Sequence, residues 1–169
     1  WQYQVWPTGW REAILFPLFK NRGVRINPGD YRLIAVMPVL AKAFEKILDT
    51  RLRDWAERVG MLSDLQGGFR SFRSTLDQMF ILNEAIAMAQ EQKAALYMTF
   101  IDVKKAYDRV WRSGLWHTLM TKGVSPHIRG MIRRIYESVL RRVLIGDQLT
   151  EPVSVEAGVA QGAVLSPLL

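Results

Sequence analysis

The spacing of hydrophobic residues in the first sixty positions predicts three elements, namely two strands and a long helix. Two short apolar runs at residues 12–19 and 31–37 flank a basic stretch, KNRGVRINPGD, in which a Pro-Gly dipeptide indicates a turn. This pattern predicts two strands joined by a basic loop. From position 39, apolar residues recur at helical spacing until Gly60 stops the pattern. We therefore expect one long amphipathic helix, whose apolar face consists of Leu40, Phe44, Ile47, Leu48, Leu52 and Trp55.

The middle of the chain is predicted to form a loop, a helix and a buried strand. Residues 61–74 carry glycine and serine, and the following TLDQ has the form of a capping box that opens a helix. The apolar face of this helix is formed by Met79, Leu82, Ile86 and Ala89. Residues 95–103 are apolar and nearly continuous, which is typical of a central strand covered on both faces.

The pattern in the last third of the chain predicts two helices, around residues 113–122 and 126–139. Gly123 follows the first helix, and Pro126 begins the second. The segments RRVLIGD and EPVSVEAGV then indicate a pair of strands with a turn near Gly146. The chain shows no repeat, low-complexity tract or flexible linker, and its composition shifts only mildly near residue 94.

The charge of the chain points to a polyanionic partner. Lysine and arginine number 23 against 16 acidic residues, a formal net charge of +7, and such an excess most often serves phosphate binding with release of counterions. Nucleic acid is the leading candidate, and charge alone leaves a merely soluble basic surface open as the alternative. The basic residues form three segments that could line one groove: Lys20, Arg22, Arg25 and Arg32; Arg70 and Arg73; and Arg133, Arg134, Arg141 and Arg142.

Composition excludes several kinds of site. The chain has no cysteine, which excludes disulfides and thiolate metal sites, and its two histidines, His117 and His127, lack zinc-ligand spacing. With 49% hydrophobic residues, the 169-residue chain can bury the core of one domain or two small subdomains. No stretch reaches the roughly 18 apolar residues of a membrane span, so we expect no membrane partner.

Asp102 is the first candidate for chemistry, because it stands at the end of the predicted buried strand. A carboxylate there is well placed to hold Mg²⁺, which takes one or two protein carboxylates and completes its shell with substrate phosphates. Capping of the turn after the strand is the alternative role for Asp102. Asp108 lies beyond this turn, where capping of the next helix is the better explanation. Tyr107 either returns to the same pocket to contact a sugar or packs in the core.

The segment AGVAQGAVLSP, residues 157–167, is the second candidate. Glycine lets a backbone approach a ligand closely, and the amide of Gln161, next to Gly162, can form hydrogen bonds with that ligand. Because glycine-rich turns are common, this segment alone does not establish a site.

Four separated motifs occur in one order: YRLIAVMPVLAKAFEKILDTRL, LQGGFRSFRSTLDQ, FIDVKKAYDRVW and GVAQGAVLSPLL. Together they resemble the reverse transcriptases of non-LTR (LINE-type) retrotransposons, in which these blocks read approximately YRPISLLPVLSKIFEKIL, QFGFR-RSTTDQ, F-DI-KAFD-V and GVPQGSVLSPLL. The resemblance covers nearly the whole chain. It implies an RNA-directed DNA polymerase of right-hand architecture and an α+β fold, with a mixed or antiparallel palm sheet and packed helices. We expect residues 1–94 to form the fingers and the fingers-to-palm segment, and residues 95–169 part of the palm.

The resemblance also implies a mechanism and its partners. In the family, Asp102 corresponds to the first metal-binding aspartate and Tyr107 to the aromatic gate that disfavours a ribose 2′-hydroxyl, whereas Asp108 matches a structural position. Two-metal phosphoryl transfer with Mg²⁺ or Mn²⁺ is implied, in which one ion activates the primer 3′-hydroxyl and the other holds the triphosphate. The implied partners are an RNA template, a DNA primer and dNTPs.

Further site residues follow by position in the motifs. Lys20 and Arg32 resemble the fingers residues that grip the incoming triphosphate. Gln161 and Gly162 resemble the pair that lines the templating base and the nucleotide. The fingers-to-palm motif, which is thought to contact the template, supplies Gln66, Gly68, Phe69 and Arg70, and we add the neighbouring Arg73.

The sequence departs from the family pattern without losing a charge that the chemistry needs. Leu33 and Ala160 stand where the family usually has proline, Ala163 replaces serine, and Gly67 with Gly68 replaces a typical Phe-Gly pair. These changes leave a second hypothesis open, namely a catalytically dead relic or a retained nucleic-acid-binding module.

We expect this chain to be a segment of a longer protein, since it begins on Trp1 and ends on LSPLL. The family's second carboxylate motif, an aromatic-Ala-Asp-Asp turn downstream of the Gln-Gly pair, occurs nowhere in the sequence. One carboxylate does not hold two metal ions at the spacing of roughly 3.5–4 Å that in-line displacement requires. The 169 residues alone are therefore expected not to polymerise.

Overall fold

The computed structural model describes residues 5–137 and 139–169, which divide into two compact units. Unit 1 comprises Trp1–Trp55 and Lys105–Leu169, and unit 2 comprises Ala56–Lys104. These units are groups of residues in mutual contact. The functional division into fingers and palm near residue 94 is a different kind of boundary and stays a prediction.

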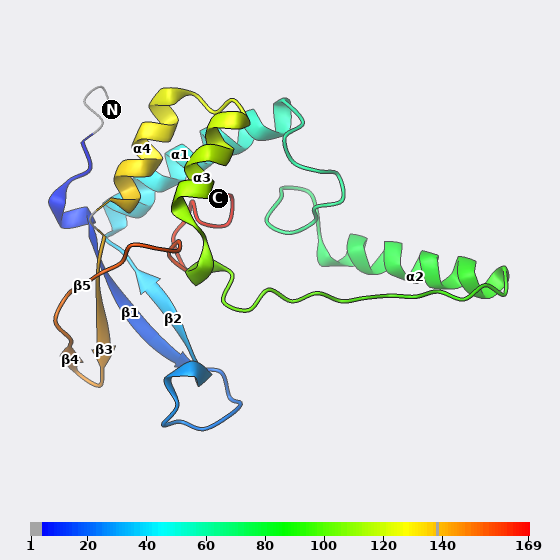
Figure 1. Ribbon diagram of the computed structural model, residues 1–169, viewed down its shortest axis with the longest axis horizontal. Coiled ribbons are helices and arrows are strands. Elements are labelled where there is room, and N and C mark those ends of the chain that lie inside the picture. Colours follow the sequence, from blue (N-terminus) through cyan, green and yellow to red (C-terminus); the bar gives the residue numbers. More distant parts are fainter. Residues whose placement is uncertain (1–4, 138) are drawn as a thin grey trace. The chain divides into compact units, whose positions relative to one another are not determined.

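Unit 1 contains a mixed five-stranded sheet (Figure 1). Its strands are β1 (Glu12–Phe19), β2 (Tyr31–Val36), β3 (Leu140–Ile145), β4 (Gln148–Leu149) and β5 (Val153–Ser154). The order is β2-β1-β3-β4, and β5 also pairs with β3. Strand β1 runs antiparallel to β2 and parallel to β3, while β3 is antiparallel to β4 and β5. The predicted α+β class and the strands near both chain ends are confirmed.

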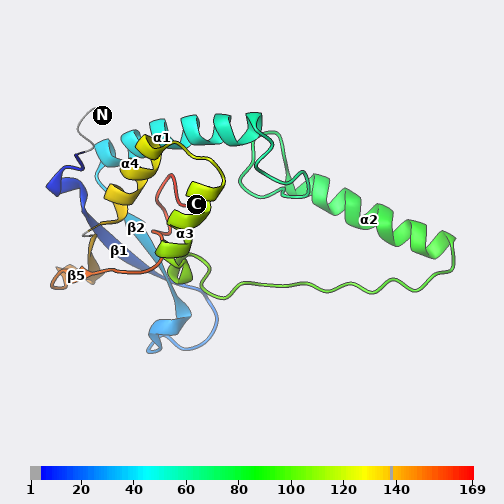
Figure 2. The same ribbon diagram turned by 45° about the horizontal axis from the view of Figure 1, so that its top comes forward.

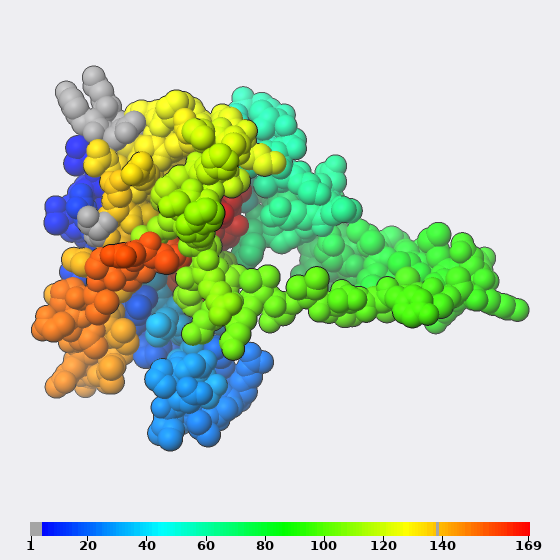
Figure 3. All heavy atoms as spheres, viewed as in Figure 1, coloured from blue at the N-terminus to red at the C-terminus, as the bar shows by residue number. Residues whose placement is uncertain are grey.

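The basic loop between β1 and β2 is ordered by its own polar groups. It contains the short 3-10 helix η2 (Pro28–Asp30). The Asp30 carboxylate accepts hydrogen bonds from the Val24 backbone N–H at 2.9 Å and from Asn27 Nδ2 at 3.1 Å. At its base, the rings of Phe19 and Tyr31 lie 5.4 Å apart. The loop projects from the body of unit 1 (Figure 3, blue), so its cationic side chains are presented on a shaped turn.

Three helices form the main core of unit 1: α1 (Val39–Arg58), α3 (Arg112–Thr121) and α4 (Pro126–Tyr136). They lie together on one side of the sheet in both ribbon views (Figures 1 and 2). Ser125 caps α4, since its hydroxyl accepts from the Ile128 N–H, and Pro126 occupies the first turn. The fully buried side chains of this core include Leu48, Leu52, Met131, Ile132 and Leu165.

The buried face of α1 differs from the predicted one. Leu40 is 66% exposed and Ile47 49% exposed, so neither is in the core. Ala41 and Glu45 are instead fully buried on the same side as Leu48. Small and charged residues contribute to this face, and a pattern that counts only large apolar side chains misses them.

Unit 2 holds α2 (Thr75–Glu91), which begins with the predicted capping box shifted by one residue. Ser74 is the N-cap: its side chain accepts from the Asp77 N–H, and the Asp77 carboxylate accepts from the Ser74 N–H. None of the described residues of α2 is buried. No described helix in either unit is long and apolar enough to cross a membrane.

The predicted central strand at residues 95–103 is wrong for this structure. The segment has no regular secondary structure, and its residues are all exposed. A strand exists only where neighbouring strands accept and donate its backbone hydrogen bonds, and no described strand pairs with this segment. The segment is apolar, but an apolar composition does not provide the neighbouring strand that a strand must pair with.

Candidate functional site

The turn that carries Gln161 and Gly162 lies directly against the edge of β2. The Ala35 N–H donates to the Gln161 carbonyl at 2.8 Å. Gly162 has φ +107°, and a Cβ at this position would lie 2.8 Å from the Ala35 carbonyl oxygen. The contact therefore requires glycine at 162. It also leaves Gln161 half-exposed and Gly162 exposed, accessible to a ligand.

Small side chains allow this close approach. Ala160 and Ala163, which flank the turn, are buried in a cluster with Ala13 of β1 and Ala35 of β2. These two alanines are the positions where the sequence departs from the family's proline and serine. The departures thus coincide with a tight contact between turn and sheet, and they leave the Gln-Gly pair in place.

The residues just before the turn bind the segment that carries Tyr107. This tyrosine opens the 3-10 helix η3 (Tyr107–Arg109) and is half-buried against the main core. The Val159 N–H donates to the Tyr107 carbonyl at 2.8 Å, and the Gly158 N–H donates to the Val110 carbonyl at 3.0 Å. Two backbone hydrogen bonds therefore tie Tyr107 to a chain segment that reaches Gln161 two residues later.

The predicted phosphate-gripping residues lie at the loop end of the β1–β2 hairpin. Lys20 follows β1, and its Nζ donates to the Gly29 carbonyl at 2.8 Å. Arg32 is exposed on β2, three residues before Ala35, and three residues of strand span about 10 Å. Unit 1 thus holds Lys20, Arg32, Tyr107, Gln161 and Gly162, and the segments that carry the last four are joined by backbone hydrogen bonds.

Asp102 belongs to unit 2, where it is exposed in the irregular segment that follows α2. Among the described residues, no group of three or more histidine, aspartate or glutamate side chains is arranged to hold a metal ion. A metal site built from three such side chains is thus not present around Asp102 in the described part of the chain, and substrate phosphates would have to supply most of the oxygen ligands of a divalent ion. Asp108 does not cap α3, because the N-cap is Trp111 and it makes no side-chain capping bond.

The fingers-to-palm motif forms a compact loop in unit 2, and Arg70 organises it. Arg70 donates to both carboxylate oxygens of Glu57, from Nε at 2.9 Å and from Nη2 at 2.6 Å, and from Nη1 to the Ser63 carbonyl at 2.6 Å. The hydrogen bonds with Glu57 raise the pKa of the Arg70 guanidinium. Arg73 forms a more exposed ion pair with Asp64 at 3.1 Å. Arg70 therefore fastens the loop to the end of α1, and Arg73 is paired within the loop.

The other predicted template residues differ in their surroundings. Phe69 has a left-handed backbone conformation with φ +58°, and the residue is 65% exposed. Gln66 and Gly68 are also exposed. A Cβ on Gly68 would meet nothing within 4 Å, whereas one on Gly67 would lie 2.6 Å from Gln78 Nε2. A side chain at 67 would therefore displace the flexible end of Gln78, whereas one at 68 would enter open space.

The third basic segment does not present a free row of charges. Arg133 and Arg134 both pair with Glu137, at 3.1 and 3.5 Å. Arg142 pairs with a glutamate of β1 at 2.6 Å. Arg141 is half-buried, and burial lowers the pKa of its guanidinium. Arg133 and Arg134 nevertheless stay more than half exposed in these pairs, so the groove formed by the three basic segments stays a prediction.

Arg112, at the start of α3, is a residue that the sequence did not single out. Its Nε donates to the Gly158 carbonyl at 2.9 Å, and its Nη1 donates to the carbonyls of Val155 at 2.8 Å and Tyr136 at 3.0 Å. Its Nη2 reaches the Ala157 carbonyl at 3.3 Å. Burial lowers the pKa of this guanidinium. No signal in the sequence marks it, because its partners are distant backbone carbonyls.

Glu45 is the second residue that was missed, and here a signal existed. Glu45 lies four residues after Ala41 and three before Leu48, at helical spacing on the buried face of α1. Its Oε2 accepts from the backbone N–H groups of Val164 at 2.9 Å and Leu165 at 3.4 Å. A single acidic residue in register with an apolar stripe therefore pointed to a buried contact.

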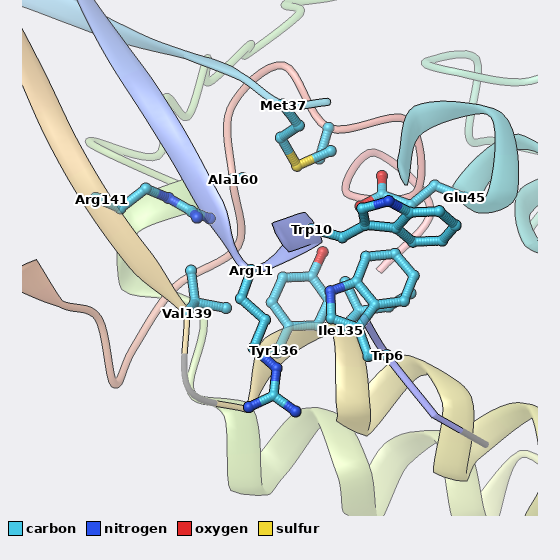
Figure 4. A pocket seen from close by; sticks show the side chains of 11 residues that line it. Trp6, Trp10, Arg11, Met37, Glu45, Ile135, Tyr136, Val139, Arg141 and Ala160 are labelled. Carbon is cyan, nitrogen blue, oxygen red and sulfur yellow. The ribbon is translucent and has the colours of Figure 1, made fainter. Parts of the chain in front are cut away.

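Glu45 is also one of the residues that line a small cavity (Figure 4). The cavity measures about 10 Å³ and is lined by Trp6, Trp10, Met37 and Tyr136 among others. Glu45 Oε1 has no hydrogen-bond partner in the described part of the chain. Burial raises the pKa of Glu45, against the opposing effects of its two backbone hydrogen bonds and of the charges on Arg141 and Lys42.

Comparison with known sequences decides the family. The family model described as reverse transcriptase (RNA-dependent DNA polymerase) matches residues 19–169. The chain belongs to the reverse transcriptase family. The match includes every predicted site residue, from Lys20 to Gly162.

The relatives of this reverse transcriptase chain come from mobile elements. It is 32% identical over 166 residues to the probable RNA-directed DNA polymerase from transposon BS of Drosophila melanogaster, and 30% identical over 166 residues to that from transposon X-element. Each alignment covers 98% of this chain and 18% of the relative. A retrovirus-related Pol polyprotein from type-1 retrotransposable element R2 of Popillia japonica is 30% identical over 167 residues, covering 96% and 22%. The resemblance to non-LTR retrotransposon reverse transcriptases is confirmed.

Replacement of Gly158 tests the contact between the turn segment and η3. Gly158 has φ +77°, and a Cβ would lie 2.8 Å from the carbonyl oxygens of both Tyr107 and Asp108. Gly123 has a similar φ of +84° but nothing within 4 Å, which makes it the matched control. We expect Gly123→Ala to lower the free energy of unfolding by about 1–2 kcal/mol through backbone strain, and Gly158→Ala by about 1–3 kcal/mol more through overpacking. Equal losses in denaturant titrations would contradict the contact.

The raised pKa of Glu45 predicts a pH-dependent stability. Because the folded state holds this proton more tightly than the unfolded chain, whose carboxyl titrates near 4.5, the stabilising contribution is complete below that pH. It is lost as the pH rises through the raised folded value. We expect Glu45→Gln, which cannot titrate, to gain stability relative to the unsubstituted chain over this interval. Parallel denaturant titrations from about pH 4 to 8 measure the difference, and a pH-independent difference would contradict the prediction.

Proposed function

We propose that this chain forms the fingers and the first part of the palm of a right-hand RNA-directed DNA polymerase encoded by a non-LTR retrotransposon. Residues 1–94 are assigned to the fingers and the fingers-to-palm segment, and residues 95–169 to part of the palm. The chain spans 18% of the length of the first two relatives. The activity, substrates and partners of the whole protein are therefore part of the proposal: template-directed DNA synthesis on RNA from a DNA primer and dNTPs.

One observation carries the proposal beyond family membership. The Gln161-Gly162 turn lies against the edge of β2, the strand that also carries Arg32. The segment before the turn is hydrogen-bonded to Tyr107. A nucleotide site needs cations for the triphosphate, a surface for the sugar and backbone or amide groups for the base. Unit 1 supports this combination on two hydrogen-bonded segments.

Each residue has a role that its chemistry suits. Arg32 offers a planar set of donors to phosphate oxygens. Lys20 uses one of three ammonium donors on Gly29, which leaves two for phosphate. Tyr107 is proposed to place its ring against the sugar and to exclude a 2′-hydroxyl. Gln161 and Gly162 are proposed to line the base pair formed by template and nucleotide.

The unit 2 loop is proposed to act on the template. Phe69 presents an exposed ring suited to stacking on a base. Arg70 holds the loop through Glu57, so its contribution is to shape the loop that carries Gln66, Gly68, Phe69 and Arg73. Single-stranded nucleic acid is bound by such combinations of aromatic and cationic side chains.

Asp102 is proposed to supply one carboxylate ligand to Mg²⁺ or Mn²⁺. In the family such ions provide charge stabilisation for phosphoryl transfer. The described residues contain no group of three or more acidic or histidine side chains placed to hold a metal ion, so the proposal assigns to this chain a single ligand and not a complete two-ion site.

The proposal is tested by primer extension with the complete reading frame that carries this sequence. We expect extension of a DNA primer on an RNA template with dNTPs and Mg²⁺ or Mn²⁺, and its loss in Asp102→Asn, since the neutral amide is a weaker ligand for a hard cation. Asp147→Asn is the control, because Asp147 is equally exposed in the turn between β3 and β4. No extension by the unsubstituted protein would refute the proposed activity. Extension by Asp102→Asn at the unsubstituted rate would refute the role of Asp102.

The 169-residue chain by itself gives a separate prediction. It lacks an aromatic-Ala-Asp-Asp sequence, and one carboxylate does not hold the pair of ions that in-line displacement needs. We therefore expect no primer extension by the isolated chain in the same assay. Salt-dependent binding of RNA, measured by filter retention, is expected to persist because it depends on the basic residues. Extension by the isolated chain would contradict this prediction.

A further inference from the structure

The turn that carries Gln161 and Gly162 is held at both ends by charged side chains from outside it. Before the turn, β5 ends at Ser154, and residues 155–169 contain no helix or strand. Such a segment cannot rely on a ladder of backbone hydrogen bonds. Its position depends on the groups that bind it from neighbouring elements.

Arg112 binds the approach to the turn. Its guanidinium donates to the carbonyl oxygens of Val155, Ala157 and Gly158. It also donates to the carbonyl oxygen of Tyr136 at the end of α4. It also lies over the Tyr136 ring at 5.5 Å. One planar cation therefore joins the start of α3, the end of α4 and the chain leading to Gln161.

Glu45 binds the exit from the turn. Its Oε2 accepts from the N–H groups of Val164 and Leu165, the second and third residues after Gly162. Leu165 is itself fully buried in the main core, and the neighbouring Ser166 hydroxyl lies 3.1 Å from that of Tyr136. The Glu45 contact is buried, where a hydrogen bond to a charged group counts for more than at the surface.

The geometry points to Arg112 and Glu45 as positioning residues that hold the Gln161-Gly162 turn, together with Tyr107, in the arrangement that binds the incoming nucleotide. This inference rests on the proposed function of that turn. Neither residue touches the nucleotide in this assignment. Arg112 acts through Gly158 and Val159, whose N–H groups bind the Tyr107 segment, and Glu45 acts through the residues that follow Gly162.

Steady-state kinetics with the complete reading frame test the inference. We expect Arg112→Ala and Glu45→Ala to raise the KM for dNTP about tenfold or more, since small displacements of a binding group have effects of this size. The KM for primer and template should stay unchanged in both variants. In Arg112→Ala, discrimination against ribonucleotides should also fall, because the segment that binds Tyr107 is displaced. Lys122→Ala, which removes an exposed lysine just after α3, is the control and should change none of these values.

Conservative variants separate positioning from a general loss of structure. Glu45→Gln keeps an acceptor oxygen for the two N–H groups and should restore the KM for dNTP to near that of the unsubstituted protein. Arg112→Lys keeps the charge but cannot reach four carbonyls in one plane, so an intermediate KM is expected. An equal rise in the KM for dNTP and for primer-template, or no rescue by Glu45→Gln, would overturn the inference.

Hydrogen exchange tests the same contacts independently of polymerisation. The amides of Gly158, Val159, Val164 and Leu165 should exchange faster in Arg112→Ala and Glu45→Ala, by about tenfold or more, than in Lys122→Ala. Unchanged exchange would overturn the inference whatever the activity. If the unsubstituted protein does not extend a primer, the proposed function fails, and exchange still decides whether the two residues hold the turn.

Discussion

The contact between a small-residue turn and the edge of β2 is the constraint on which unit 1 depends. Gly162 comes so close to the Ala35 carbonyl that a Cβ would lie 2.8 Å away, and Gly158 comes equally close to the carbonyls of η3. Because neither position tolerates a side chain without movement, the segment has one place to lie. The helices α1, α3 and α4 then pack behind it, with Leu165 in their core.

Charged side chains, rather than regular secondary structure, complete this arrangement. The irregular segment 155–166 has no helix or sheet to satisfy its backbone donors and acceptors. Such groups cost free energy when they are buried without partners. Arg112 supplies donors to its carbonyls and Glu45 supplies an acceptor to its N–H groups. The cost is the burial of a carboxylate, which appears as the raised pKa of Glu45.

Unit 2 shows how far local sequence signals reach without long-range partners. The helix α2 forms where its capping residues predict, one residue from the expected start, because capping and propensity act within a few residues. The apolar segment 95–103 forms no strand, because strand formation depends on pairing that no described strand provides. The sequence likewise predicts that Arg70 contacts nucleic acid, yet in the structure its N–H groups donate to Glu57 and Ser63.

The sequence by itself determined the elements that local physics controls, and the family. Strands β1 and β2, helices α1 and α4, the basic hairpin and the Gln-Gly motif all follow from spacing, turn residues and motif order. Tertiary structure alone decided which face of α1 is buried, that Ala160 and Ala163 pack on the sheet, and that Arg112 and Glu45 bind the turn. These contacts join residues more than 40 positions apart. Helical spacing marks Glu45 as part of a buried face, and nothing in the sequence marks Arg112. In neither case does the sequence identify the partner, because the partner is a backbone group far away along the chain, so only the folded chain reveals it.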